Sequence, residues 1–319
     1  MKNRIVVTGG AGFIGSHIVD RLLSEGNEVI VLDNLSSGRM EFLGAHIGNS
    51  NFKFIKLDLL EPENLKKAVK DADMIFHIAA NPDVRLGAED TNIHLEQNVI
   101  ATYNVLEAMR INRLKNIVFT STSTVYGEAA LIPTPENYGP LVPISLYGAS
   151  KLACEALITS YCHTFDMNSW IFRFANIVGD RGTHGIIVDF INKLRNDPGA
   201  LEILGDGKQS KSYLHVSDCV DSILFAVGNS SDMANIFNIG SNDTISAREI
   251  GEIVVEEMGL KDVKFNYTGG ARGWKGDVPR MMLSIDKLQA LGWKPSYNSR
   301  NSVCDTARSL LSNDRYILS

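Results

Sequence analysis

Short apolar segments alternate with helical segments over the first 180 residues of the chain. Each apolar segment is bounded by polar residues or glycine and is mostly apolar on both faces, which is typical of a parallel sheet covered on both sides. The predicted strands are Arg4–Thr8, Glu28–Leu32, Phe52–Lys56, Met74–His77, Asn116–Thr120 and Trp170–Phe174. Helical periodicity predicts helices at 13–24, 62–70, 91–112 and 145–166. This alternation predicts an α/β fold with a doubly wound, Rossmann-type parallel sheet.

The pattern changes after Ile177, where glycine-rich loops separate shorter strands and helices. Ser246 and Glu249 have the spacing of a capping box and predict a helix that continues through Glu257. We therefore expect residues 1–177 to form the Rossmann domain and residues 178–319 to form mainly a smaller α/β domain, with some segments returning to the first.

Composition and charge exclude several classes of protein. The 319 residues are 44% hydrophobic and 21% charged, which excludes a disordered or fibrous chain. A net charge of −6 argues against a general nucleic-acid binder. No apolar run is long enough to span a membrane, and the apolar run at the N-terminus predicts a strand rather than a signal peptide. We expect a cytoplasmic protein with reduced cysteines, no membrane or nucleic-acid partner and no metal site.

A glycine-rich turn follows the first predicted strand. Gly10, Gly12 and Gly15 match G-x-G-x-x-G, and Gly9, Gly12 and Gly15 match the related G-x-x-G-x-x-G. Such glycines let the backbone turn, approach a pyrophosphate and pack a helix on the strand. Asp33 follows at the end of the second strand, where a carboxylate accepts ribose hydroxyls and repels a ribose phosphate. This combination predicts binding of NAD.

Further candidates for cofactor binding lie at the ends of the next strands. Asp58 closes the third strand, where an adenine would lie, although a helix-capping or loop role explains it equally well. Ala79 and Ala80 end the fourth strand, and their small side chains would let a cofactor pass close to the backbone. The full set of candidate cofactor-binding residues is Gly9, Gly12, Phe13, Ile14, Gly15, Asp33, Asn34, Asp58, Leu59, Ala79, Ala80, Asn98, Tyr147 and Lys151.

Tyr147 and Lys151 form a Y-x-x-x-K pair at the start of the helix predicted at 145–166. A spacing of four places both side chains on one helix face. The pair alone has little significance, because such pairs often arise by chance. Its position gives it weight, since the preceding strand ends in the hydroxyl-rich segment 121–127.

The motifs TGGAGFIG, HIAA, TSTSTVYG, YGASK and RFANIVG occur in this order along the chain. Together they resemble the extended short-chain dehydrogenase/reductase family, and within it the sugar-nucleotide epimerases of the UDP-glucose 4-epimerase type. The resemblance implies that Tyr147 is the catalytic base, that Lys151 holds the nicotinamide ribose and the tyrosinate, and that Thr122 binds the reacting hydroxyl. An unperturbed tyrosine has a pKa of about 10, and nearby cations would favour its phenolate.

The residues after Thr122 discriminate between reactions of this family. Related 4,6-dehydratases carry a glutamate there, often after an aspartate, whereas this chain has Ser123 and Thr124, neither of which is a general acid or base near neutral pH. On the substrate side the resemblance points to Asn176, to Lys211 in place of the usual arginine, and to Arg272, which is displaced from its commonest alignment. A turn asparagine and a surface-loop arginine remain alternative explanations for Asn176 and Arg272. The candidate substrate-binding residues are Thr122, Ser123, Tyr147, Asn176, Lys211 and Arg272.

The resemblance implies NAD-dependent epimerisation of a nucleotide sugar at carbon 4 through a 4-keto intermediate, with UDP-glucose and UDP-galactose as the expected pair. Alternatives are a uronate or acetamido-sugar 4-epimerase, a dehydratase or a reductase, and, in another class, a non-catalytic NAD-sensing or scaffold protein. Met281 does not discriminate for or against an acetamido group. A homodimer is also expected, through the helices predicted at 91–112 and 145–166. Its candidate contacts are Val99, Tyr103, Leu106, Leu152, Leu157 and Ile158.

Overall fold

The computed structural model describes residues 2–274 and 276–313. The described chain divides into two compact units. The first unit contains residues 1–127, 140–173 and 223–237, and the second contains residues 128–139, 174–222 and 238–319. The chain therefore enters the second unit for a short segment after residue 127, and it returns to the first after residue 222.

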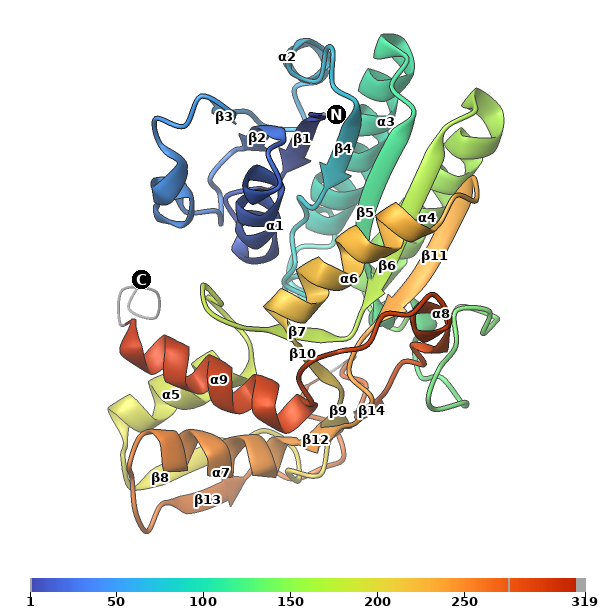
Figure 1. The fold of residues 1–319 in the computed structure, drawn as a ribbon. Helices are drawn as coiled ribbons and strands as arrows, with labels where there is room; N and C mark the ends of the chain where they lie inside the picture. Colours follow the sequence, from blue (N-terminus) through green and yellow to red (C-terminus); the bar gives the residue numbers. More distant parts are fainter. Residues whose placement is uncertain (1, 275, 314–319) are drawn as a thin grey trace. The chain divides into compact units, whose positions relative to one another are not determined.

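A parallel sheet organises the first unit and confirms the predicted fold class (Figure 1). Among the described residues its strand order is β11-β6-β5-β4-β1-β2-β3. β1 pairs in parallel with β2 and β4, β2 pairs with β3, and β4 pairs with β5. The strands are β1 (Arg4–Thr8), β2 (Glu28–Asp33), β3 (Phe52–Lys56), β4 (Met74–His77), β5 (Asn116–Thr122), β6 (Asn168–Phe174) and β11 (Ala234–Ile239). The order reverses between β1 and β4, and ligands of such sheets bind at the carboxyl ends of the strands beside this point.

Helices cover both faces of this sheet because its strands are apolar on both faces. The side chains of Val6, Ile75, Ile117 and Ile171 pack with α2, α3 and α4 in one buried cluster. The helices of this unit and its shorter turns are α1 (Phe13–Ser24), η1 (Met40–His46), α2 (Pro62–Ala68), η2 (Leu86–Ala88), η3 (Leu95–Ile100), α3 (Ala101–Asn112), η4 (Ser123–Tyr126) and α4 (Leu146–Phe165), while α6 (Val216–Asn229) contains residues of both units. No helix among the described residues is both long enough and apolar enough to cross a membrane.

Three local differences from the predicted elements concern the site. β5 continues to Thr122 rather than ending at Thr120, so the predicted catalytic hydroxyl is the last residue of a strand. The single helix predicted at 91–112 begins as the π-helical segment η3 and becomes α-helical at Ala101. The helix α4 begins at Leu146, where the Ser145 side chain accepts a hydrogen bond from the backbone N–H of Gly148 at 3.1 Å.

The second unit is built from short strands around its own core. The helices α5, α7 and α9 enclose that core with β8, and the capping box of Ser246 and Glu249 opens α7 as predicted. Its strands are β7 (Asn176–Val178), β8 (Ala200–Ile203), β9 (Ser210–Lys211), β10 (Tyr213–His215), β12 (Ile245–Ser246), β13 (Lys264–Tyr267) and β14 (Arg280–Met281). Its helices are α5 (Ile186–Asn196), α7 (Ala247–Glu257), α8 (Asp286–Ala290) and α9 (Ser299–Ser312).

Candidate active site

The glycine-rich turn between β1 and α1 leaves no room for side chains. Gly9 has a φ of +69°, and a Cβ there would lie 2.7 Å from the backbone nitrogen of Ala79. A Cβ at Gly15 would lie 2.1 Å from the carbonyl oxygen of Gly9. Gly12 is the N-cap of α1 and offers no side chain to its first turn, which begins with Phe13 and Ile14. A helix N-terminus approached by bare backbone is suited to a pyrophosphate, so the turn fits a dinucleotide.

Asp33 ends β2 beside this turn and is held by two backbone donors. Its carboxylate accepts hydrogen bonds from the N–H groups of Ala11 at 3.0 Å and Leu35 at 2.8 Å. Burial raises the pKa of this carboxyl, and the two N–H groups oppose that rise. The hydrogen bonds fix the orientation of the carboxylate while leaving lone pairs for ribose hydroxyls. The geometry therefore suits the predicted role in NAD binding.

The neighbouring strand ends carry the other predicted cofactor residues. Asn34 donates to the Asp58 carboxylate at 3.0 Å, and Asp58 also accepts from the N–H of Leu60 at 2.9 Å. Leu59 is buried in the core. Ala79 and Ala80 are half-buried at the end of β4, and the first of them packs against Gly9. The structure thus gathers these residues around the ends of β1, β2, β3 and β4.

Asn98 ties the segment after β4 to α4. Its side-chain oxygen accepts from the N–H of Asn81 at 2.8 Å, and its amide nitrogen donates to the Ser150 hydroxyl at 2.9 Å. Asn98 lies in the π-helical segment η3 and is almost fully buried. Asn98 therefore contacts Ser150, the residue before Lys151 on α4. Its contact with the cofactor remains a prediction.

The predicted catalytic residues meet at the end of β5. The hydroxyl of Thr122 is hydrogen-bonded to the phenol of Tyr147, which lies in the first turn of α4. The same Thr122 hydroxyl accepts from the N–H and the hydroxyl of Thr124 at 3.2 Å and 3.1 Å and so caps η4. Ser123, the first residue of η4, is half-buried beside it.

Lys151 lies one turn along α4 from Tyr147 and is buried. Its Nζ donates to the carbonyl oxygen of Thr120 at 2.9 Å and lies 4.8 Å from the centre of the Phe119 ring. Burial lowers the pKa of Lys151 to about 8, and Cys154 and Glu155 oppose that fall. The lysine is therefore close to its titration midpoint at mildly alkaline pH.

The pKa of Tyr147 differs from the expectation based on Lys151 alone. Burial raises it to about 12, and the hydrogen bond from Thr122 only partly offsets this effect. His94 packs edge-on against the Tyr147 ring, with ring centres 5.6 Å apart, and adds to its apolar surroundings. Lys151 does not by itself bring the phenol towards neutral titration, because its ammonium is directed at the Thr120 carbonyl. The chain's own groups thus hold a protonated tyrosine at neutral pH.

The predicted substrate residues of the second unit gather around a carboxylate that sequence reasoning did not assign to the site. Asp277 is 3% exposed and accepts from Lys211 Nζ at 2.6 Å and from the N–H of Gly273 at 3.0 Å. Arg272 donates to the backbone oxygen of Asp277 at 2.6 Å and to Glu128 at 2.6 Å. Asn176 begins β7 and donates to the backbone oxygen of Ser212, next to Lys211. Both cations among the predicted substrate-binding residues, Lys211 and Arg272, are therefore paired with carboxylates, and their contact with a nucleotide sugar stays a prediction.

Sequence reasoning also missed a buried histidine near the cofactor strands. His77, from the HIAA motif, lies between the hydroxyls of Thr8 at 2.8 Å and Thr102 at 2.9 Å. Burial and the nearby Lys151 lower its pKa to about 3, so it stays neutral. The position of His77 in the HIAA motif is the feature of the sequence that could have drawn attention to it. Among residues 2–274 and 276–313, the structure contains no cluster of three side chains suited to hold a metal ion.

Comparison with known proteins gives the family. The model of the NAD dependent epimerase/dehydratase family matches residues 5–240. The chain belongs to this family. It is 32% identical over 311 residues to the UDP-glucose 4-epimerase of Mycolicibacterium smegmatis, covering 95% of this chain and 97% of that protein. The predicted family and the use of NAD are thereby confirmed.

Solved structures of the same family resemble the whole chain. A crystal structure of a UDP-galactose 4-epimerase matches with a TM-score of 0.87 and 42% identity, covering 97% of this chain and 99% of that one. The UDP-glucuronic acid 4-epimerase from Bacillus cereus, in complex with UDP-glucuronic acid and NAD, matches with a TM-score of 0.88 and 27% identity, over 97% and 99% of the two chains. This protein is thus an enzyme of the NAD-dependent epimerase/dehydratase family, while its relatives differ in the sugar that they bind.

Proposed function

We propose that this enzyme inverts carbon 4 of a nucleotide sugar, and that UDP-glucose and UDP-galactose are its substrate pair. The observation that carries the proposal is the hydrogen bond between Thr122 and Tyr147 beside the buried Lys151. A hydroxyl and a phenol that already share a hydrogen bond can both reach a sugar hydroxyl placed next to them. The similarity to a UDP-galactose 4-epimerase and a UDP-glucose 4-epimerase supports this choice of sugar.

In the proposed mechanism each group of the chain has one task. Thr122 holds the hydroxyl at carbon 4, and Tyr147 takes and later returns its proton. Lys151, fixed by the Thr120 carbonyl, holds the nicotinamide ribose and adds positive charge near the phenol. NAD, when bound, supplies the acceptor and donor of hydride and a cationic ring that favours the phenolate.

The residues beside Thr122 argue against elimination of water. Ser123 and Thr124 begin η4, and the Thr124 hydroxyl donates to Thr122. A dehydratase needs a second acid–base group for the proton that leaves with water, and neither hydroxyl provides one near neutral pH. Inversion at carbon 4 needs a single base, so the site supports epimerisation better than dehydration.

We further propose a division of labour between the two units, in which the first holds NAD and the second holds the nucleotide sugar. Asp33 and the glycine turn lie in the first unit, while Asn176, Lys211 and Arg272 lie in the second. Lys211 and Arg272 would exchange their carboxylate partners Asp277 and Glu128 for the diphosphate. Such an exchange keeps each cation paired throughout.

The proposal is tested by incubating the purified protein with single UDP-sugars, with and without added NAD, and identifying the products. UDP-glucose is expected to yield a mixture that contains UDP-galactose. Conversion of UDP-glucuronic acid alone would favour the second candidate, a uronate 4-epimerase, which the similarity to the B. cereus enzyme supports. A 4-keto-6-deoxy product would show a dehydratase, and bound NAD with no change in any sugar would show a non-catalytic protein.

A further inference from the structure

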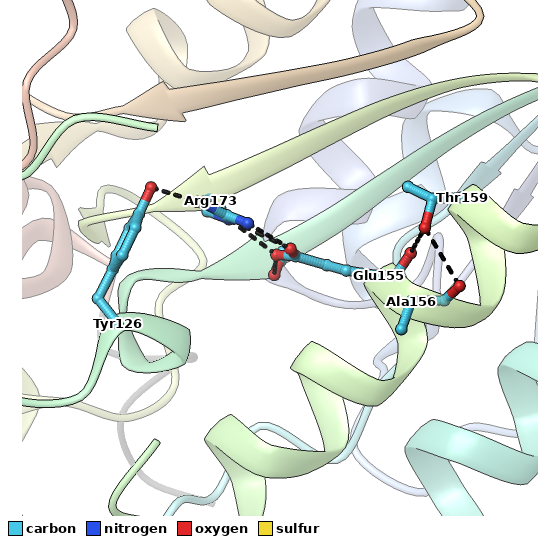
Figure 2. Close-up of polar contacts among 6 residues, drawn as sticks. Tyr126, Glu155, Ala156, Thr159 and Arg173 are labelled. Atoms are coloured by element: carbon cyan, nitrogen blue, oxygen red, sulfur yellow. Dashed lines mark hydrogen bonds and ion pairs between the residues drawn. The ribbon is translucent and has the colours of Figure 1, made fainter. Parts of the chain in front are cut away.

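A buried ion pair between Arg173 and Glu155 has no part in the mechanism above (Figure 2). Arg173 on β6 donates from Nη2 and Nε to the Glu155 carboxylate on α4, at 2.7 Å and 3.1 Å. Both side chains are about 4–5% exposed. Stability alone does not account for such a buried charge pair, because well-packed apolar residues in its place are often equally or more stabilising.

The remaining hydrogen-bonding groups of the pair contact residues on either side of Thr122. The Ser121 hydroxyl donates to the Glu155 carboxylate, and Ser121 directly precedes Thr122 on β5. Arg173 Nη1 donates to the Tyr126 hydroxyl at 2.9 Å, and the guanidinium lies 4.8 Å from the centre of the Tyr126 ring. Tyr126 ends η4, the turn that Thr122 caps. The network therefore fixes the end of β5 and the following turn to α4 and β6.

Glu155 lies on the same face of α4 as Tyr147 and Lys151. Tyr147, Lys151 and Glu155 are spaced by four residues along α4 and so lie along one face. Arg173 holds the Glu155 carboxylate in a two-point ion pair, and the hydrogen bond and charge of Glu155 raise the pKa of Arg173 although burial lowers it. A buried ion-pair carboxylate therefore lies one helical turn from Lys151, in a poorly solvated region.

Among the titratable groups around Lys151, Cys154 and Glu155 favour its protonated form, and Glu155 is the carboxylate of the two. On α4 these groups are Tyr147, Cys154 and Glu155; β4 contributes His77, the segment before η3 contributes His94, and β6 contributes Arg173 through its pair with Glu155. Both histidines have pKa values lowered by burial, and Lys151 lowers them further. Cys154 has a pKa raised by burial, so it stays a thiol at neutral pH.

We propose that Glu155 is a positioning residue of the active site: it places a carboxylate one helical turn from Lys151, and its pairing with Arg173 and Ser121 holds Thr122 opposite Tyr147. The effect of Glu155 on turnover rests on the proposed function, whereas its effect on Lys151 does not. This role explains a buried pair that packing alone does not require.

Two variants separate this role from a merely structural one. Glu155→Gln removes the charge at nearly constant shape but leaves the buried Arg173 cation without its carboxylate, which is destabilising. The double variant Glu155→Leu with Arg173→Met replaces the pair by apolar side chains of similar length, and such replacements are often neutral or stabilising. Thermal unfolding shows whether each variant is folded, and the double variant provides the test if Glu155→Gln is not.

The first measurement is the titration of Lys151 by NMR in protein labelled at the lysine ε-carbon, with its resonance assigned from its loss in Lys151→Arg. Wild-type protein is expected to titrate near pH 8. Glu155→Gln is expected to titrate about one pH unit lower, because a nearby opposite charge shifts a pKa by about that amount. The double variant, which also removes the Arg173 cation, is expected to shift in the same direction by less. An unchanged midpoint in folded Glu155→Gln, or in the double variant where Glu155→Gln does not fold, would overturn the proposal.

The second measurement is steady-state turnover of the sugar that the panel of UDP-sugars identifies, as a function of pH. At pH 8 the protonated fraction of Lys151 would fall from about one half to about one tenth. We expect kcat to fall about fivefold and its alkaline limb to move down with the NMR midpoint, while KM changes about twofold or less. A folded double variant with wild-type kcat would overturn the positioning role. If the wild type turns over no sugar, the proposed function fails while the NMR result still decides whether Glu155 controls Lys151.

Discussion

At the scale of single residues, Tyr147 is the group on which the proposed chemistry depends most directly. It combines a hydrogen bond to Thr122 with a pKa that burial raises to about 12. We expect Tyr147→Phe to lower kcat by about a thousandfold while NAD still binds, because the ring keeps its packing against His94 but no base remains. Steady-state kinetics and calorimetric titration with NAD measure the two effects. Tyr161→Phe, on the same helix, is the matched control, and activity of Tyr147→Phe within tenfold of the wild type would contradict the assignment.

Lys151 makes a second prediction at this scale, on stability against pH. Its pKa is about 8 in the folded chain, whereas an unburied lysine has a pKa of 10.5. Between these two values the unfolded chain therefore binds a proton that the folded chain has released. The contribution of Lys151 to the free energy of unfolding of the wild type therefore rises with pH across this window, because the unfolded chain binds more protons than the folded chain. We expect this contribution to be absent from Lys151→Met, so that the stability of the wild type relative to the variant grows by about 2–3 kcal/mol between pH 7.5 and pH 10.

Urea unfolding at the two pH values measures this difference. Tyr147 acts in the opposite direction, since its raised pKa makes stability fall with pH above about 10, and the comparison stays below that range. Lys53→Met, at an exposed position of β3, is the control for loss of a lysine charge. Parallel stability profiles for wild type and Lys151→Met would show that Lys151 does not titrate in this window.

At the scale of elements, the turn from β1 to α1 sets the position of the cofactor. A Cβ at Gly15 would overlap the carbonyl oxygen of Gly9, and that backbone cannot move without displacing the turn. We expect Gly15→Ala to lower the free energy of unfolding by about 1–3 kcal/mol and to weaken NAD binding. Gly44→Ala in η1 is the control, because a Cβ there meets nothing within 4 Å. Denaturant unfolding and calorimetry test both variants, and equal behaviour of the two would refute the steric argument.

The ends of helices were predicted best where the capping residue lies next to the helix in the sequence. Ser145 caps α4 and Ser246 with Glu249 caps α7, and in both cases the capping residue is adjacent to the turn that it satisfies. The π-helical start of the helix before Ala101 was not predicted, and within it the Asn98 side chain contacts Asn81 and Ser150, which lie far from it in the sequence. Periodicity carries no information about such partners.

At the scale of the whole molecule, we propose that two copies associate through α3 and α4. The structure corrects the residues expected at this interface, since Leu106 and Ile158 are fully buried in the core of their own chain. Val99 and Leu157 are partly buried against the same core. Tyr103 is 44% exposed, and the same helices and η3 expose further large apolar side chains, namely Leu95, Ile100, Ile111, Leu146 and Phe165. An exposed apolar face of this kind is suited to an isologous interface.

We expect light scattering of the wild-type protein at micromolar concentration to give the mass of two chains. Tyr103→Glu is expected to give the mass of one chain, because it places a charge at an exposed apolar position of α3. Ile47→Glu, at a 70% exposed position beside η1, is the matched control and should remain a dimer. A single-chain mass for the wild type would refute the dimer.

The sequence by itself determined the α/β class, the order of the strands along the chain and the glycine turn with Asp33. It also brought Thr122, Tyr147 and Lys151 forward as one group, although their roles remain predictions. These features are local: strand and helix periods repeat within a few residues, and Gly15 and Tyr147–Lys151 are defined by short fixed spacings. Such patterns carry their meaning without knowledge of the rest of the fold.

Only the tertiary structure decided which distant groups meet. Asp277 pairs with Lys211 and Glu128 with Arg272, and the sequence could offer these cations only as candidates for a phosphate. Arg173 meets Glu155 because β6 lies beside β5 and α4 packs against that strand. Leu106 and Ile158 turned inward because an apolar position marks a buried face but not the surface that buries it. Periodicity is a property of one segment, whereas ion pairs, shifted pKa values and interfaces arise only when packing brings separate segments into contact.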